Sequence, residues 1–364
     1  MTTETERVVV VGAGLSGLAV AVRLLGARCE VVVLEASSRV GGQIDTFSAG
    51  PLVVELGAEG FVSRSRAVPA LAAFLGIEGA LVEQLTTDTF ALEQGQLVLL
   101  PPGEAARRLG FQVPPEELGR GIRSFARGMG QLVDALAARL SPAQLRLRTS
   151  VAAIARGEAG LSVQLDEGQP LTAAAVVLAV PARQAAALLA PLGLAECAPL
   201  AVAPVLSNVS VNLLYSCQQF STYPAGSGVI FPEGFAEVGL RAFSLVDHKF
   251  PGRVGAGQAL LRVFFRPSEA ALAAWSDERF AGEAAKAIAR VLPVEGGPTR
   301  SWVSRWADAL PVFSADYRAQ VAAVDPALQR LGIHVTGSAF HGAGIDAAVG
   351  SAEWVAERLA HARA

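Results

Sequence analysis

The sequence predicts an α/β protein with two sheets, one of them parallel and the other mostly antiparallel. A β-branched run, a glycine-rich turn and an apolar helical pattern open the chain at residues 8–25, and a second strand, loop and helix pattern closes it at residues 331–359. Between them, residues 204–266 alternate strand patterns with Gly, Pro and Asn turns. Strand-then-helix units are typical of parallel sheets, and closely spaced strands are typical of antiparallel ones.

Composition indicates a globular protein with room for about two domains, because 52% of the 364 residues are hydrophobic and 17% are charged. The net charge of −3 disfavours a nucleic-acid-binding surface, which needs a basic excess. Cys29, Cys197 and Cys217 are too scattered for a disulfide framework or a metal site. Apolar runs end well before the roughly 18 residues of a membrane span, and the N-terminus lacks the order of a signal peptide, so we expect a cytoplasmic protein.

The opening stretch predicts a dinucleotide site. The strand Val8–Val11 has no alternation, as expected for a strand buried on both faces, and three glycines lead into a helix. In this arrangement the first glycine makes a tight turn, the second admits a pyrophosphate and the third lets helix pack on strand, while an acid ending the next strand binds a ribose. The candidate contacts of this Rossmann-like unit are Gly12, Gly14, Ser16, Gly17 and Glu35.

The residues after Glu35 favour FAD over NAD. In "EASSRVGGQIDT", Arg39, Gly41 and Gly42 resemble the extended signature of glutathione-reductase-like flavoproteins, in which such residues line the FAD phosphates and ribityl chain. By the same resemblance Val151, which opens a strand, and Pro181, which closes the buried strand at 175–180, are cofactor-shell residues. Ordinary strand packing is the alternative for both.

The later elements complete the two sheets. Residues 276–292 predict a helix with Ser276 as its N-cap, following the strand-rich region. Residues 331–336 predict the last parallel strand, 337–344 a loop and 346–359 a closing helix, whose N-terminal amides can stabilise negative charge on a reduced flavin. Candidate cofactor contacts here are Gly337, Gly344, Ile345 and the ring of Trp306, for which core packing is the alternative.

Four segments spread along the chain carry a more specific resemblance. "LGAEGFVSRSRAVPALAAFLGIEGALV", "HKFPGRVGAGQALLRVF", "RWADALPVFSADY" and "GIHVTGSAFHGAGIDAAVGS" resemble the oxygen-dependent protoporphyrinogen and coproporphyrinogen oxidases of the flavin amine oxidase superfamily. The resemblance implies FAD, a porphyrinogen substrate, hydride transfer to flavin N5, and O2 as acceptor with H2O2 as product. It also implies a helical insertion in the substrate domain, of which only residues 103–127 remain here.

The resulting division of the chain is discontinuous. We expect three FAD-binding parts, at residues 1–90, 128–190 and 301–364. A shortened substrate-domain segment occupies residues 91–127, and a β-sheet with a helix occupies residues 191–300.

Four residues are candidates for a catalytic role by this resemblance. Arg64 and Arg66 follow the strand containing Glu55 and suit a carboxylate, the alternative being solvated surface arginines. Lys249 is of interest because amine-oxidising relatives use a lysine, through water, near flavin N5, although a surface position is the simpler expectation for a lysine. His341 could move a proton, or could merely bond to backbone.

Three functions therefore stay open. The first is porphyrinogen oxidation. The second is an FAD-dependent oxidase or dehydrogenase of an amine or secondary metabolite, and the third is a non-catalytic or partner-dependent flavoprotein, for which an apolar patch at residues 109–122 would be the docking surface. The expected partners are a small-molecule substrate and O2, with a homo-oligomer or a partner subunit left open.

Overall fold

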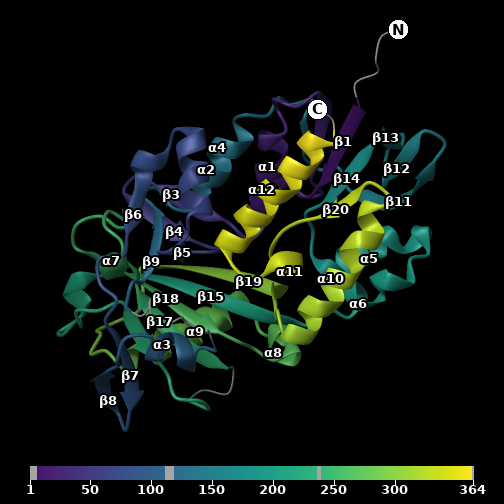
Figure 1. Cartoon of the computed structure of the whole chain (residues 1–364). Coiled ribbons are helices and arrows are strands. Elements are labelled where there is room, and N and C mark those ends of the chain that lie inside the picture. Colours follow the sequence, from purple (N-terminus) through teal and green to yellow (C-terminus); the bar gives the residue numbers. More distant parts are fainter. Residues whose placement is uncertain (1–5, 111–118, 236–238, 363–364) are drawn as a thin grey trace.

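The computed structural model describes residues 6–110, 119–235 and 239–362. A parallel sheet and a mostly antiparallel sheet form its two parts, stacked one above the other in Figure 1. The predicted fold class, a Rossmann-like domain of the glutathione-reductase type with a second sheet domain, is confirmed. No helix among these residues is long and apolar enough to cross a membrane.

The parallel sheet has five strands in the order β10-β2-β1-β14-β20. Their bounds are β10 (Leu145–Arg146), β2 (Cys29–Leu34), β1 (Glu6–Val11), β14 (Ala175–Leu178) and β20 (Ile333–Val335). The central strand β1 is buried from Val8 to Val11 because β-branched side chains meet a packed layer on both faces of the sheet.

Helices cover one face of this sheet, and a small antiparallel sheet together with three further helices covers the other. The first layer contains α1 (Leu15–Arg23), α2 (Ala67–Leu75), α4 (Gly130–Ala137) and α12 (Ile345–His361). The second contains β11 (Val151–Gly157), β12 (Gly160–Leu165), β13 (Leu171–Ala173), α5 (Ala182–Leu189), α6 (Ala198–Ala201) and α10 (Ala315–Gln329). The N-terminal and C-terminal helices α1 and α12 pack against each other, so the two ends of the sequence build one layer.

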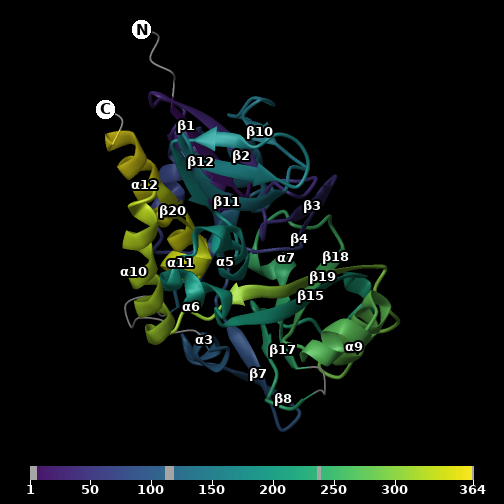
Figure 2. The same cartoon turned by 90° about the vertical axis from the view of Figure 1, so that its right-hand side faces the viewer.

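The second sheet has seven strands in the order β19-β15-β18-β17-β16-β7-β8. Their bounds are β19 (Arg300–Pro311), β15 (Val205–Ser216), β18 (Gln258–Phe265), β17 (Leu240–Leu245), β16 (Gly228–Ile230), β7 (Thr89–Glu93) and β8 (Gln96–Leu99). All neighbours pair antiparallel except β16 and β7. Figure 2 shows this sheet below the parallel one, with β15 and β19 running side by side.

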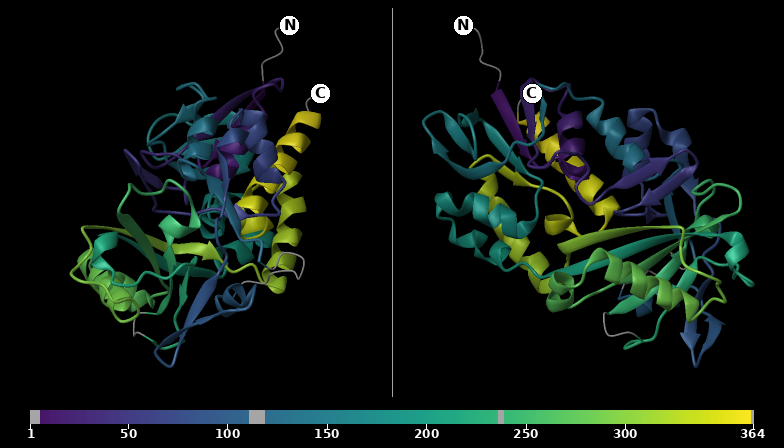
Figure 3. Two further views of the ribbon diagram at one scale, coloured as in Figure 1. Left: turned by 90° about the vertical axis from the view of Figure 1, so that its left-hand side faces the viewer. Right: turned by 180° about the vertical axis from the view of Figure 1, so that it is seen from behind.

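Strand alternation gives the second sheet two different faces. On one face, the odd-numbered apolar residues of β15 pack with helix α9 (Asp277–Ala289), which lies away from the parallel sheet in Figure 3. On the other face, Asn212 and Arg262 are directly opposite each other and point toward the first domain. Ser276 caps α9 as predicted, because its hydroxyl accepts the backbone N–H of Arg279 at 3.3 Å.

Short elements join the two sheets. They are the hairpin β3 (Thr46–Ala49) and β4 (Leu52–Glu55), the strands β5 (Phe61–Val62), β6 (Leu81–Glu83) and β9 (Ile122–Phe125), and the helices α3 (Glu104–Arg108), α7 (Val246–Lys249), α8 (Glu269–Ala274) and α11 (Ser338–His341). The chain enters the second sheet at β7, returns to the parallel sheet at β10, enters the second sheet again at β15 and leaves it finally after β19. Since β19 pairs with β15, its residues lie with the second sheet, whereas the expected division at residue 300 assigns them to the FAD-binding part.

Two local expectations differ from the structure. Residues 337–344, expected as a loop, contain the single-turn helix α11, and the closing helix starts at Ile345. Leu25, expected on the apolar face of α1, lies beyond the end of that helix and is 39% exposed.

Candidate functional site

The three glycines after β1 differ in the space beside them, as the motif predicts. A side chain on Gly12, whose φ is +100°, would meet the Ala179 carbonyl oxygen at 2.6 Å, and one on Gly17 would meet the Gly12 oxygen at 2.0 Å. Gly14 has ordinary backbone angles, and a side chain on it would meet only the Gly42 Cα, at 4.0 Å. Nothing within the described chain therefore requires Gly14 to lack a side chain, and the open space beside it fits a ligand.

The N-terminus of α1 is free to receive an anion. Its N-cap is Gly14, no side chain caps it, and its first turn holds no acidic residue. The carboxylate of Glu35 lies beside it, accepting the backbone N–H groups of Ala13 at 2.8 Å and Ser37 at 2.9 Å. These contacts fix the acid next to the glycine turn, where a nucleotide ribose would lie.

The second glycine pair packs directly on the first motif. Gly41 donates its N–H to the Ala13 carbonyl at 2.8 Å and forms a bridge with Gly14. Arg39 holds this turn in shape, because its guanidinium donates to the carbonyls of Gly42 at 2.8 Å and Val40 at 3.0 Å. The structure therefore brings Arg39, Gly41 and Gly42 to the N-terminus of α1, as the resemblance to flavoproteins implies, and these residues fit FAD.

The remaining predicted shell residues reach the same edge of the parallel sheet. Pro181 is exposed shortly after β14 ends and directly follows Ala179 and Val180, the two residues that a side chain on Gly12 would meet. Val151 starts β11 shortly after Thr149, whose N–H donates to the Glu35 carbonyl at 2.8 Å. A role for either side chain in holding the cofactor stays a prediction.

The start of α12 meets this edge from the other end of the sequence. Gly337 and Gly344 both have positive φ, at +103° and +101°, and Gly344 is the N-cap immediately before Ile345. Ser16 donates its hydroxyl to the Ala348 carbonyl at 3.1 Å, so α1 and α12 are tied together at their first turns. Ser16 thus contributes by joining the two helices, and its contact with a cofactor stays a prediction.

The arginine-bearing loop is attached to this same helix start. Arg64 and Arg66 are exposed on either side of buried Ser65, whose hydroxyl donates to the carboxylate of Asp346 in the first turn of α12. The hydrogen bond of Ser65 therefore attaches the backbone of this loop to the start of α12, and a carboxylate-binding role for Arg64 and Arg66 stays a prediction. His341 lies differently, since its Nε2 is 3.0 Å from the Val335 carbonyl and its ring packs 5.8 Å from that of Trp354.

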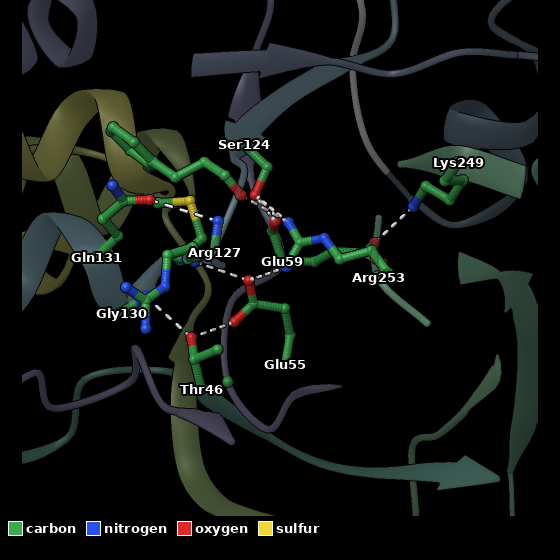
Figure 4. Close-up of polar contacts among 12 residues, drawn as sticks. Thr46, Glu55, Glu59, Ser124, Arg127, Gly130, Gln131, Lys249 and Arg253 are labelled. Carbon is green, nitrogen blue, oxygen red and sulfur yellow. Dashed lines mark hydrogen bonds and ion pairs between the residues drawn. The ribbon is translucent and has the colours of Figure 1, made fainter. Parts of the chain in front are cut away.

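The surface position expected for Lys249 is wrong. Lys249 is 8% exposed, and its Nζ lies 2.5 Å from Oε2 of Glu59, as Figure 4 shows. Burial raises the pKa of Glu59, but Lys249 and Arg262 lower it by more, so that the carboxylate stays ionised. The lysine is buried because short helix α7 inserts beside the loop that follows β4, where an acid neutralises it.

Glu55 and Arg253 form a second buried pair, which the sequence analysis missed. Their side chains are 2% and 0% exposed, with Arg253 Nη1 at 3.1 Å from Glu55 Oε1. Arg253 also donates to Ser124 Oγ at 2.8 Å, and Thr46 donates to Glu55 at 2.6 Å (Figure 4). Burial raises the pKa of Glu55, whereas Arg253 and the hydrogen bonds from Thr46 and the Met129 amide lower it by less. The signal in the sequence that could have indicated this pair is an acid or an arginine inside an otherwise apolar segment.

The polar face of the second sheet packs on the end of β4 and the loop that follows it. Asn212 donates to the Glu55 carbonyl at 3.0 Å, Trp306 to the Leu56 carbonyl at 2.9 Å, and Arg262 to the Gly57 carbonyl at 2.6 Å. Gly57 itself packs on the segment after the glycine pair, since a side chain there would meet the Gln43 oxygen at 2.1 Å. The second sheet is therefore fixed next to the dinucleotide motif, and Trp306 serves this docking.

No group of three or more His, Cys, Asp or Glu side chains among the described residues is arranged to hold a metal ion. The arrangement instead suits a nucleotide cofactor: two helix starts without side-chain caps, the Glu35 carboxylate and a cover of polar side chains meet at one edge of the parallel sheet.

Comparisons with known proteins agree with this geometry. A family profile described as flavin containing amine oxidoreductase matches residues 101–360, and a profile described as NAD(P)-binding Rossmann-like domain matches residues 10–75. A coproporphyrinogen III oxidase of Propionibacterium freudenreichii is 31% identical over 240 residues, which are 65% of this chain but only 45% of that protein. A solved structure assigned as a protoporphyrinogen oxidase from Exiguobacterium superposes with a TM-score of 0.85 at 21% identity, covering 99% of both chains.

A more distant relative shows how the lengths differ. The coproporphyrinogen III oxidase of Bacillus subtilis is 20% identical over an alignment of 468 residues that covers 95% of this chain and 96% of that protein. Since this chain has 364 residues, at least 104 aligned positions of the relative (468 less 364) have no counterpart here. The match of the family profile over most of the chain, together with these relatives, decides the classification. The chain belongs to the flavin containing amine oxidoreductase family, as an FAD-dependent oxidoreductase similar to the coproporphyrinogen and protoporphyrinogen oxidases.

Proposed function

We propose that this protein oxidises a porphyrinogen to a porphyrin, with O2 as the final electron acceptor and H2O2 as the second product. The observation that carries the proposal is the arginine-bearing loop of Arg64 and Arg66, which the Ser65–Asp346 hydrogen bond attaches to the start of α12. The similarity to coproporphyrinogen III oxidases along nearly the whole chain supports it.

FAD, when bound, would supply the two-electron redox chemistry of the reaction. The residues that would hold it are the glycines of the two motifs, Glu35 and the N-termini of α1 and α12. The remaining contribution of the chain is to bind and orient the substrate.

The chain would orient the substrate through its carboxylates. An arginine guanidinium donates two parallel hydrogen bonds to a carboxylate, so Arg64 or Arg66 could fix a propionate group at the rim of the site. The start of α12, to which the arginine-bearing loop is attached, would contribute its partial positive charge, which stabilises negative charge. No acid-base pair is required of the protein beyond this.

The test is an anaerobic stopped-flow mix of the FAD-loaded protein with coproporphyrinogen III and, separately, protoporphyrinogen IX, following flavin absorbance. Bleaching on a catalytic timescale, with porphyrin fluorescence when O2 is admitted, is the expected result. Arg64→Met and Arg66→Met should raise KM for the porphyrinogen more than they lower kcat, because they remove ground-state binding. Flavin that stays oxidised with both substrates rejects the proposal.

Amine oxidation is the second candidate, and the burial of Lys249 is the observation that favours it. A lysine assisting the reaction with oxygen has to be enclosed rather than on the surface. The same stopped-flow experiment with a diamine in place of the porphyrinogen distinguishes the two candidates by which substrate bleaches the flavin.

A docking surface at residues 109–122 has no specific support. Leu109 and Ile122 are both partly buried, and Leu109 packs on the small cluster around Leu100 and Ile230. Residues 111–118 lie outside the described residues.

A further inference from the structure

Five ionisable side chains are buried together where the second sheet meets the loop after β4. Arg253 is 1% exposed, Glu55 3%, Arg262 4% and Lys249 8%, and the Glu59 side chain is 11% exposed. Within the part of the chain that the structure describes, this cluster holds three cations and two carboxylates. The cluster therefore has one positive charge more than it can neutralise internally.

The unmatched charge is on Arg262. Glu55 pairs with Arg253 at 3.1 Å and Glu59 pairs with Lys249 at 2.5 Å, which accounts for both carboxylates. Among the described residues, Arg262 donates only to neutral acceptors, namely the Gly57 carbonyl at 2.6 Å and Ser210 Oγ at 3.2 Å, and its buried Nε has no hydrogen-bond partner. Burying a cation without an anion is costly, and arginine does not escape the cost by losing its proton.

Two acceptors near Arg262 are also without donors. The buried Oδ1 of Asn212, the direct cross-strand neighbour of Arg262, has no hydrogen-bond partner in the part of the chain that the structure describes, and neither has Oε1 of Glu59. Buried polar atoms are rarely left in this state, because each one costs the desolvation of that group. The site thus offers an unused cationic donor beside unused acceptors.

We propose that this cluster is a substrate subsite in which Arg262 binds a carboxylate, while Asn212 and Glu59 accept N–H groups of the same molecule. The matching ligand class is an organic acid that also carries N–H donors. A porphyrinogen has both groups, so the inference rests on the proposed function and deepens it. The site lies beside the dinucleotide motif, because Arg262 contacts Gly57 and Gly57 packs on the segment after the glycine pair.

Propionate is the probe that tests the subsite without turnover. Thermal unfolding of the FAD-loaded protein is followed against propionate concentration, with chloride keeping the ionic strength constant. A ligand that binds only the folded state raises Tm as its concentration passes its Kd. We expect Tm to rise in the wild type, and Arg262→Met to weaken propionate binding about ten-fold or more, the effect of losing a charge-assisted hydrogen bond.

A second variant separates ligand binding from a merely structural role. Glu59→Gln removes a carboxylate from the cluster, so it should lower the starting Tm and yet tighten propionate binding, because the excess of positive charge grows. The matched control is Arg300→Met, which removes an exposed arginine from the same face of the sheet and should leave propionate binding unchanged. If Arg262→Met does not fold, Arg262→Lys replaces it in the experiment and is compared with Glu59→Gln. Lysine keeps the positive charge but lacks the paired hydrogen-bond donors of the guanidinium.

Each outcome decides something. Equal propionate affinity in the wild type and the Arg262 variant overturns the subsite, as does weaker binding in Glu59→Gln. Propionate protection that depends on Arg262, in a protein that ignores both porphyrinogens, keeps the subsite and rejects the proposed function. Porphyrinogen turnover in which Arg262→Met and Arg300→Met have the same KM keeps the function and rejects the subsite.

Discussion

Replacing Arg253 by methionine should destabilise this protein strongly. The change removes the hydrogen bonds to Glu55 at 3.1 Å, Ser124 at 2.8 Å and the Phe125 carbonyl at 3.1 Å, and leaves a carboxylate that is 3% exposed without its cation. Breaking a buried ion pair by removing one partner typically costs about 3–5 kcal/mol, because the remaining charge stays buried. We expect a loss of that size in the free energy of unfolding at pH 7, measured by urea denaturation of the FAD-loaded protein.

The pH dependence of this loss identifies its cause. Burial raises the pKa of Glu55, and removing Arg253 should raise it further above the value in the unfolded chain. The folded variant then binds one proton more than the unfolded chain, so its stability falls as pH rises, by up to about 1.4 kcal/mol per pH unit. The deficit of the variant against wild type should therefore be smaller at pH 5.5 than at pH 8.

Two comparisons complete the experiment. The double variant Glu55→Gln/Arg253→Met removes both charges, and it should be more stable than the sum of the single losses predicts, with a coupling energy of about 1–3 kcal/mol. Arg156→Met, which changes an exposed arginine on β11, should stay within about 0.5 kcal/mol of wild type. A loss below about 1 kcal/mol for Arg253→Met, or a deficit independent of pH, would show that the Glu55–Arg253 pair does not stabilise the folded protein in this way.

Three further changes test the cofactor site and the second buried pair. Gly17→Ala should lower the unfolding temperature whether or not FAD is present, because the new side chain would meet the Gly12 oxygen at 2.0 Å. Gly14→Ala should leave the unfolding temperature of the apoprotein unchanged and weaken FAD binding, measured by fluorescence titration. Glu35→Ala loses the acceptor of the Ala13 and Ser37 amides, so FAD affinity should fall about ten-fold or more, while Glu30→Ala on the exposed part of the same strand should keep it. Lys249→Met should cost about 3 kcal/mol or more at pH 7, and the deficit should shrink in acid. The reason is that the lowered pKa of Glu59 gives the wild type a stability that is present above the unfolded value and lost as pH falls. A deficit that is the same in acid and at neutral pH contradicts this last account.

The parallel sheet and its nucleotide motif could be predicted from the order of residues alone. Steric demands in this part are local: Gly12 and Gly17 leave no room for a side chain, and a run of valines without alternation fits only a strand covered on both faces. The pairing of the first and last helices could also be inferred, because both follow strands of one parallel sheet and the ends of such strands meet at one edge.

Which charged residues are buried, and which partners neutralise them, could not be predicted without the folded structure. Lys249 looks like a surface residue in sequence, and nothing in its neighbourhood along the chain reveals Glu59, which lies in a loop of the other domain. Glu55 and Arg253 are equally distant in sequence. Burial of a charge depends on the geometry of its partner, and that geometry exists only after the second sheet has docked on the loop after β4.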